Sequence, residues 1–321
     1  SARNSVEILK QHGVNAELFD LSGWMDHETL PFDEMIQKSF RGVDLQATMP
    51  IVTGYTKCSE GIMTTFDRGY SEITFSRIAV LTGAGEGVIH KEFHLSSSDP
   101  KLVGEDNVEI IGNTNYDVAD QLADLGMEAI HPRASKGMEL QGIPLRIKNA
   151  FEPDHPGTLI DRDYRSDAPR VEMVTGCKDI LGIELVDPDM VGQSGYDFEI
   201  LRFLAKHKIS YVAKNTNANT ITHYVRQDEP TLDACIEDLK AAFPGATLRC
   251  QTVAIVSAIG SNMAVPGFLA RAANALNDEG TNILAMDQCM RQVNMQFVVD
   301  EADFDQAIIA LHRGLVEQKG A

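Results

Sequence analysis

Two stretches in the C-terminal half repeat one order of secondary structure, and this repeat restricts the fold more than any other feature. Residues 171–250 read as strands, a helix, two strands, a helix and a closing strand, and residues 252–316 repeat the order strand, helix, two strands and helix. Pro266 and Gly280 stand where the start and stop signals of one helix belong. Each unit is too small to bury a large core alone, so we expect the two units to pack on each other or on a partner chain.

The first half of the chain alternates helical and strand patterns instead. Predicted strands cover residues 15–20, 50–55, 88–90 and 145–148, and predicted helices cover residues 3–12, 34–40, 71–81 and 117–125. Such alternation predicts a mostly parallel sheet with helices on both faces. Residues 153–157 and 161–169 are polar and contain proline, which is typical of a linker between this region and the repeat.

Composition excludes several classes of protein. Lys and Arg number 28 against 47 Asp and Glu, so the net charge of 28 − 47 = −19 argues against nucleic acid or an anionic membrane as the main partner. The five cysteines are scattered and the nine histidines lack metal-binding spacing, which predicts reduced thiols and no metal site. With no apolar run of about 18 residues and no signal peptide in the sequence, we expect a cytoplasmic protein.

The segment over residues 64–72 carries the strongest chemical signal. Within five positions it places the guanidinium of Arg68, the hydroxyl of Ser71 and the carboxylate of Glu72. A guanidinium suits a carboxylate and an acid suits an ammonium group, so these side chains suit a free amino acid. The alternative is a surface ion pair that caps a helix.

Four groups of residues, taken in order, resemble aspartate kinase, a member of the amino-acid kinase family. They are Val52-Thr53-Gly54-Tyr55, then residues 65–72, then Ser97-Ser98-Asp99-Pro100-Lys101, and finally a set from Gly126 through Ile130-His131-Pro132 and residues 146–151 to Pro156-Gly157-Thr158. With two units of the ACT type, the resemblance covers nearly the whole chain. The variants of these motifs most resemble those of the divergent aspartate kinases associated with ectoine biosynthesis.

The resemblance implies an α/β fold in three parts. Residues 1–165 would form the C-terminal part of a three-layer αβα amino-acid kinase domain with a mostly parallel sheet, and residues 170–250 and 251–321 would form two α+β, ferredoxin-like ACT domains. The family carries a glycine-rich phosphate loop with a lysine at its extreme N-terminus, and this sequence contains no such loop. We therefore expect an N-terminal portion to be missing, by processing or by nature, and this chain alone to be inactive.

The resemblance also assigns roles around aspartate. The family transfers the γ-phosphoryl group of ATP, with Mg²⁺, to the side chain of L-aspartate. Arg68 would hold the α-carboxylate, Ser71 would hydrogen-bond the substrate and Tyr55 would stack over it. Glu72 stands where the family has aspartate and would face the ammonium and the reacting groups, although its carboxylate is displaced by about one C–C bond, and misplacement on the order of 1 Å can lower rates about 10²-fold.

On the nucleotide side the sequence departs from the family pattern. His90 and Lys91 replace a Thr-Asp pair, Ser96 replaces a tyrosine, Lys101 replaces an arginine and Glu128 replaces a lysine. One hypothesis is a reciprocal charge swap, in which Lys91 contacts phosphate and pairs with Glu128. The alternative is that both are solvated surface charges. We expect a structural role for a further residue of the match, His131.

The ACT-type units imply an amino-acid effector and a homodimer formed through these domains. The turns over residues 189–194 and 261–267 and the strand over residues 282–286 are the expected ligand contacts. In lysine-sensing relatives the second strand of the first unit carries an acid, whereas here residues 210–214 end in Lys214. We therefore do not expect feedback by lysine, and the units would serve mainly for dimerisation.

The sequence is compatible with three hypotheses of function. The leading one is an aspartate kinase that serves either lysine, threonine and methionine biosynthesis or ectoine biosynthesis. A second is a non-catalytic module for amino-acid sensing or dimerisation, and a third is a kinase for another acidic amino acid such as glutamate.

Overall fold

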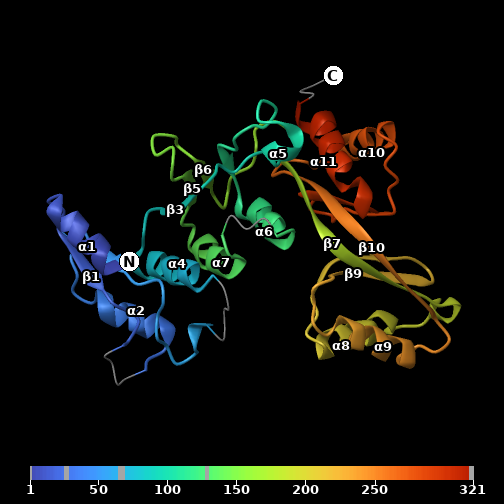
Figure 1. Cartoon of the computed structure of the whole chain (residues 1–321), viewed down its shortest axis with the longest axis horizontal. Coiled ribbons are helices and arrows are strands. Elements are labelled where there is room, and N and C mark those ends of the chain that lie inside the picture. Colours follow the sequence, from blue (N-terminus) through green and yellow to red (C-terminus); the bar gives the residue numbers. More distant parts are fainter. Residues whose placement is uncertain (1, 25–28, 64–68, 127–129, 318–321) are drawn as a thin grey trace. The chain divides into compact units, whose positions relative to one another are not determined.

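A computed structural model describes residues 2–24, 29–63, 69–126 and 130–317 (Figure 1). The chain divides into two compact units. Unit 1 contains Ser1–Phe93 and Glu128–Asp163, and unit 2 contains His94–Met127 and Tyr164–Ala321. Unit 2 therefore combines the repeat with a segment from the first half of the chain.

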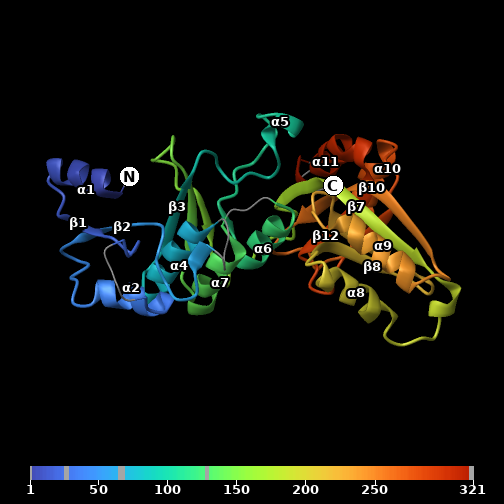
Figure 2. The same ribbon diagram turned by 60° about the horizontal axis from the view of Figure 1, so that its bottom comes forward.

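Unit 1 consists of short strands and the helices that pack beside them. Its helices are α1 (Ala2–Gln11), α2 (Phe32–Phe40), α4 (Tyr70–Thr82) and α7 (Pro132–Gln141), and its strands are β1 (Ala16–Phe19), β2 (Met49–Val52), β3 (Gly87–Lys91), β5 (Leu145–Asn149) and β6 (Thr158–Ile160). The pairs β1–β2 and β3–β5 are parallel, and β6 is antiparallel to β5. Helices α4 and α7 lie side by side in both views (Figures 1 and 2). The predicted α/β architecture with parallel sheets is confirmed.

Helix α4 illustrates how the sequence sets these elements. It buries Ile73 and Ala79 and ends at Gly83, whose left-handed backbone (φ +65°) returns its N–H to the carbonyls of Ala79 and Val80. A glycine in this conformation is a common end of a helix, because it accommodates positive φ without a Cβ clash. The apolar run over residues 73–80 and the glycine together account for the close match to the predicted helix over residues 71–81.

Unit 2 is organised around one antiparallel sheet of six strands, in the order β11-β12-β10-β7-β9-β8. The strands are β7 (Met173–Val186), β8 (Tyr211–Thr216), β9 (Thr220–Arg226), β10 (Thr247–Ile259), β11 (Ala285–Asp287) and β12 (Asn294–Asp300). The helices of the repeat are α8 (Tyr196–Lys206), α9 (Leu232–Ala242), α10 (Phe268–Asp278) and α11 (Phe304–His312). The segment from the first half adds α5 (Pro100–Val103), β4 (Asn113–Thr114) and α6 (Tyr116–Asp124).

The long strands β7 and β10 join the two repeated units, as Figure 1 shows. Residues 180–186 of β7 pair with β9 and with residues 247–253 of β10, whereas residues 173–177 of β7 pair with residues 255–259 of β10, which also pair with β12. The strand beside β10 in the second unit is thus the beginning of β7. The expected packing of the units on each other is found within one chain. Strand β10 runs through position 250 without a break, and the boundaries of the two ACT domains stay a prediction.

Apolar clusters of described residues fill unit 2. Helices α10 and α11 pack on one part of the sheet through Leu276 and Leu311, and α8 and α9 pack on the other part through Leu204 and Leu239. The opposite face of the sheet packs against α6, which begins where the side chain of Asn115 accepts a hydrogen bond from the N–H of Val118 (3.0 Å).

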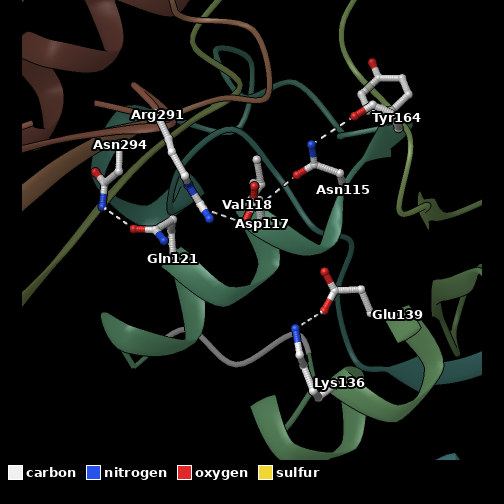
Figure 3. Close-up of polar contacts among 9 residues, drawn as sticks. All are labelled: Asn115, Asp117, Val118, Gln121, Lys136, Glu139, Tyr164, Arg291 and Asn294. Carbon is white, nitrogen blue, oxygen red and sulfur yellow. Dashed lines mark hydrogen bonds and ion pairs between the residues drawn. The ribbon is translucent and has the colours of Figure 1, made fainter. Parts of the chain in front are cut away.

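Polar contacts also attach α6 to the rest of unit 2. Figure 3 shows Arg291 beside Asp117 (2.5 Å) and Asn294 donating to Gln121 (3.0 Å). The side-chain amide of Asn115 donates to the carbonyl of Tyr164 (2.9 Å). The segment over residues 94–127 is therefore an integral part of the unit that contains the repeat. Within the described ranges, every helix is too short or too polar to cross a membrane.

Candidate functional site

The end of β2 passes directly over the first turn of α4. A Cβ atom at Gly54 would lie only 2.6 Å from the hydroxyl oxygen of Ser71, so this approach requires glycine. The next residue, Tyr55, is 37% exposed, and its ring meets that of Tyr70 edge to face, with centroids 6.1 Å apart. Thr53 fixes this turn, because its hydroxyl accepts from the N–H of Leu21 (2.9 Å) and donates to the carbonyl of Tyr55 (3.1 Å).

Helix α4 presents its N-terminus at the same place. The helix begins after Gly69, whose φ of +88° is left-handed, and no described side chain caps it. The N–H groups of Tyr70, Ser71 and Glu72 have no intrahelical acceptor, because the first N–H groups of every helix lack one. Such a terminus attracts negative charge, including a carboxylate or a phosphate.

The carboxylate of Glu72 connects three elements of unit 1. Its Oε2 accepts a hydrogen bond from the backbone N–H of His131 (2.6 Å), and its Oε1 lies 3.4 Å from Nζ of Lys91. The Glu72 and Lys91 side chains are 28% and 23% exposed. Glu72 thereby links the start of α4, the end of β3 and the start of α7.

The side chain of His131 contacts the start of α7 and the residue before α4. Its Nδ1 accepts from the N–H of Arg133 (3.2 Å) and caps α7, and its ring lies against Gly69, where a Cβ would come within 2.7 Å of the ring. The geometry accords with the structural role expected for His131. Gly54 and Gly69 were not among the predicted site residues, yet they shape the site through these close approaches. Gly54 belongs to the V-T-G-Y motif, which is the sequence signal that could have identified it.

The predicted site residues fall into three groups. Tyr55, Ser71, Glu72 and Lys91 come together in unit 1, with His90 exposed on β3 opposite Lys148. Arg68 and Glu128 lie outside the described residues. The predicted pairing of Lys91 with Glu128 therefore stays a prediction, and the described acidic partner of Lys91 is Glu72.

Ser96 and Lys101, the remaining predicted nucleotide contacts, belong to unit 2. The Ser96 hydroxyl donates to the carbonyl of Ser98 (2.7 Å). Lys101 is exposed in the first turn of α5, where its N–H donates to the side chain of Asp99 (2.9 Å). Both residues thus lie on one tightly hydrogen-bonded turn.

The first predicted effector turn, over residues 189–194, precedes α8, which forms polar contacts with the neighbouring strands of unit 2. In the first repeated unit, Lys214 forms an ion pair with Asp197 (2.6 Å), and the other oxygen of Asp197 lies 3.4 Å from the buried ring of His223. Burial lowers the pKa of His223 to about 4, against the opposing effect of Asp197, and Lys214 lowers it further.

The second effector turn is held by a buried carboxylate. Glu172 accepts from the N–H of Ser261 (3.1 Å), from the Ser261 hydroxyl and from the hydroxyl of Thr114 (2.8 Å). Beside it, the side-chain amide of Asn262 donates to the carbonyl of Ser166 (2.8 Å). The roles of these turns in effector binding stay predictions.

Comparison with known proteins now places these features. Residues 1–149 match the amino acid kinase family, and residues 256–315 match the ACT domain. The chain is 54% identical over 317 residues to "Aspartate kinase Ask_Ect" of Stutzerimonas stutzeri (strain A1501), an alignment that covers 99% of this chain and 67% of the relative. The chain belongs to the aspartate kinase family.

More distant aspartate kinases match as well. "Aspartokinase 1, chloroplastic" of Arabidopsis thaliana is 25% identical over 283 residues, which cover 84% of this chain and 48% of the relative. The chain thus spans about two thirds of the bacterial relative and about half of the plant one.

Solved structures of aspartate kinases share the fold. The Clostridium acetobutylicum aspartate kinase superposes with a TM-score of 0.82 at 22% identity and covers 98% of this chain and 74% of its own. E. coli aspartokinase III in complex with aspartate and ADP gives 0.77 at 20% identity, with 98% and 73% covered. These likenesses confirm the predicted fold class of a kinase domain with ACT domains.

Proposed function

We propose that the protein is an ATP-dependent aspartate kinase, which converts L-aspartate to 4-phospho-L-aspartate. The observation that carries this proposal is the 54% identity to an aspartate kinase along 99% of the chain. In this reaction an oxygen of the side-chain carboxylate attacks the γ-phosphorus of ATP. The bond to the bridging oxygen breaks, and ADP leaves with the electron pair. Catalysis of this kind depends on positioning and on neutralisation of charge.

The residues of unit 1 suit the amino-acid side of this reaction. The open N-terminus of α4 would receive a carboxylate together with Arg68, and Ser71 and Tyr55 stand at the same turn. One oxygen of Glu72 is occupied by the N–H of His131, so the other, which faces Lys91, would receive the ammonium group. We propose these roles for Arg68, Ser71, Tyr55 and Glu72.

The nucleotide side would rely on point charges. In unit 1, Lys91 at the end of β3 would neutralise a phosphate oxygen, with His90 beside it in sequence and Glu128 as its partner. For unit 2, we propose phosphate contacts for Ser96 and the exposed Lys101. Among the described residues, no group of three or more acidic, histidine or cysteine side chains could hold a metal. Mg²⁺ would therefore be held mainly by the phosphates, as is usual for this ion, and would supply charge neutralisation there.

An assay of the full-length gene product tests the proposal. Hydroxylamine traps acyl phosphates, so we expect ATP, Mg²⁺ and L-aspartate to yield aspartyl hydroxamate and an equal amount of ADP. Glutamate should yield neither above background. Turnover of glutamate in preference to aspartate would support a different acidic substrate, and no turnover of either would support a non-catalytic sensing module.

A lysine variant tests the nucleotide side separately. We expect Lys91→Ala to raise the KM for ATP by about tenfold, the scale of one lost charge-assisted contact, and Lys91→Arg to restore part of the affinity. Lys10→Ala, an exposed lysine on α1, serves as the control for loss of positive charge. An unchanged KM for ATP in Lys91→Ala would exclude the phosphate contact.

We further propose that the ACT-type repeat binds an amino-acid effector and forms a homodimer. Its first unit exposes the large apolar side chains of Val191 (63%), Phe198 (65%) and Tyr211 (44%), and exposed apolar patches commonly mark interfaces. Light scattering of the full-length protein should give twice the monomer mass, and Phe198→Glu should return it to the monomer mass. The choice between ectoine and the lysine, threonine and methionine pathways stays a prediction.

A further inference from the structure

One buried hydrogen-bond chain joins the S-S-D-P-K motif to the last helix of the second repeated unit. The hydroxyl of Ser97 lies 2.9 Å from Nε2 of His312, at the end of α11, and Nδ1 of His312 lies 2.9 Å from a carboxylate oxygen of Glu317. The N–H of Glu109 also donates to the Ser97 hydroxyl (2.9 Å). Ser97 and His312 are both 0% exposed, whereas the side chain of Glu317, at the end of these hydrogen bonds, is 33% exposed.

With a neutral His312 ring, one assignment of hydrogen-bond donors and acceptors fits all of these contacts. An ionised carboxylate only accepts, so Nδ1 of His312 carries the proton and donates to Glu317. In the neutral ring Nε2 then accepts, and the Ser97 hydroxyl donates to it while it accepts from the N–H of Glu109. Every buried donor and acceptor in the chain is thereby satisfied, which is the condition under which a buried polar network fixes one conformation.

The local helix geometry creates the pair between His312 and Glu317. After α11 the chain continues as a π-helical turn over Arg313–Glu317, and its wider winding brings residues five apart toward one another. Gly314 lets this turn approach α10, since a Cβ there would lie 2.9 Å from that of Ala275. π-helical turns frequently occur at functional positions.

The order serine, histidine and carboxylate is also that of hydrolytic triads. The complete burial of Ser97 excludes attack on a substrate carbonyl, and its oxygen already accepts a backbone hydrogen bond. These hydrogen bonds therefore fix the conformation of the S-S-D-P-K motif and do not take part in chemistry on a substrate.

Ser97 is the fixed point of the turn that carries Ser96 and Lys101. Its N–H donates to the carbonyl of Glu109 (2.8 Å), and its carbonyl accepts from the N–H of Val174 at the start of β7 (2.8 Å). Val103, at the end of α5, packs in the same apolar cluster as Leu311 of α11. Both ends of the turn thus contact the second repeated unit.

We propose that His312 is a positioning residue for the nucleotide, which acts through Ser97 on the turn over residues 96–101. This inference rests on the proposed function, because Ser96 and Lys101 are proposed there to contact ATP. Loss of the His312 hydrogen bond frees the turn to move, and a displacement on the order of 1 Å is enough to weaken contacts to a phosphate.

Five variants of the full-length protein separate positioning from packing. His312→Ala and Ser97→Ala remove the connection, whereas His312→Gln keeps a polar group near the position of Nε2. Leu311→Ala removes a fully buried side chain of similar size from the same helix. Ser257→Ala is the control for the serine change, because Ser257 is also 0% exposed and its hydroxyl has no hydrogen-bond partner among the described residues.

Kinetics give the first measurement. We expect His312→Ala and Ser97→Ala to raise the KM for ATP about tenfold, with the KM for aspartate changed less than about twofold. His312→Gln should recover most of the affinity, and Leu311→Ala and Ser257→Ala should stay within about twofold of the parent even where the melting temperature falls. Equal changes in His312→Ala and Leu311→Ala would overturn the inference, because packing alone would then explain them.

Hydrogen exchange gives a second measurement that does not require turnover. The amides of Ser97 and Glu109 should exchange about tenfold faster in His312→Ala than in Leu311→Ala, since only the first loses the connection. Unchanged exchange overturns the inference even in an active enzyme, and faster exchange with an unchanged KM for ATP overturns the nucleotide role. A parent protein that phosphorylates no aspartate overturns the proposed function instead, and the exchange result still decides whether His312 fixes the turn.

Discussion

The buried ring of His223 should make the stability of unit 2 depend on pH in a defined window. His223 is 2% exposed on β9, between Asp197 of α8, Lys214 of β8 and the ring of Tyr211, which it meets edge to face with centroids 5.4 Å apart. Burial is the largest cause of its low pKa, which falls from 6.5 to about 4. Asp197 opposes this shift in pKa, whereas Lys214, which is paired with the other oxygen of Asp197, adds to it.

The sign of the effect follows from the direction of the shift. Below pH 6.5 the unfolded chain binds a proton at His223 that the folded protein does not bind until about pH 4. Protonation therefore favours the unfolded state, and the free energy of unfolding falls as the pH drops through this window. The full shift corresponds to about 3 kcal/mol, and about 2 kcal/mol of it should be lost between pH 7 and pH 5.

Replacement by glutamine isolates this contribution from that of all other titrating groups. His223→Gln is neutral throughout, so its free energy of unfolding should fall by about 2 kcal/mol less than that of the parent between pH 7 and pH 5. Urea titrations followed by circular dichroism measure this difference.

An exposed histidine provides the control for this measurement. His12→Gln on α1 should leave the pH dependence of the parent unchanged. Parallel curves for the parent and for His223→Gln would show that the ring is solvated or charged in the folded state, and the argument from burial would then be wrong.

Three further predictions concern named contacts. Gly54→Ala should lower kcat/KM for aspartate roughly 10- to 100-fold with little loss of stability, because the added methyl group displaces Ser71; unchanged kinetics would contradict the close approach. A double-mutant cycle of Glu72→Gln and Lys91→Met should give a coupling of about 1 kcal/mol in kcat/KM. Additive changes would mean that the pair is not formed in solution. Arg291→Ala, which removes the exposed contact to Asp117, should change the melting temperature by less than about 2 °C, measured by calorimetry, and a larger fall would show that α6 depends on this contact.

Much of the fold could be predicted from local sequence patterns. The predicted helix over residues 71–81 lies within one residue of α4 at each end, because an apolar run over residues 73–80 and a terminal glycine both mark it. Helix α7 was not predicted. It buries only Ala134, Ser135 and Met138 and contains Gly137, so its apolar period is weak, and its contact with α4 in the tertiary structure sustains it.

Local sequence patterns do not predict that the two repeated units share one sheet. The sequence predicts two strands between residues 171 and 186, whereas the structure has the single strand β7, whose beginning pairs in the second unit and whose end pairs in the first. The packing of entire sheet faces determines which strands pair when they are far apart in the sequence. The alternating pattern within one strand does not indicate its partner.

The candidate site shows the same division between residue types and their pairing. Two departures from the family pattern, Glu72 in place of aspartate and Lys91 in place of the acid of a Thr-Asp pair, were interpreted separately from the sequence. In the structure their side chains lie 3.4 Å apart, and the longer side chain at position 72 reaches Lys91 with one oxygen and the N–H of His131 with the other.

A paired acid and base at these positions changes how both substitutions are understood. An aspartate would be shorter by about one C–C bond and could not span the same two partners from the start of α4, so glutamate and lysine are favoured together. Among the described residues, the acidic partner of Lys91 is Glu72, which is proposed to face the ammonium group of the substrate. The charge of Lys91 is thereby held at the end of β3 in a half-buried place, where a lysine without an acidic partner would be costly.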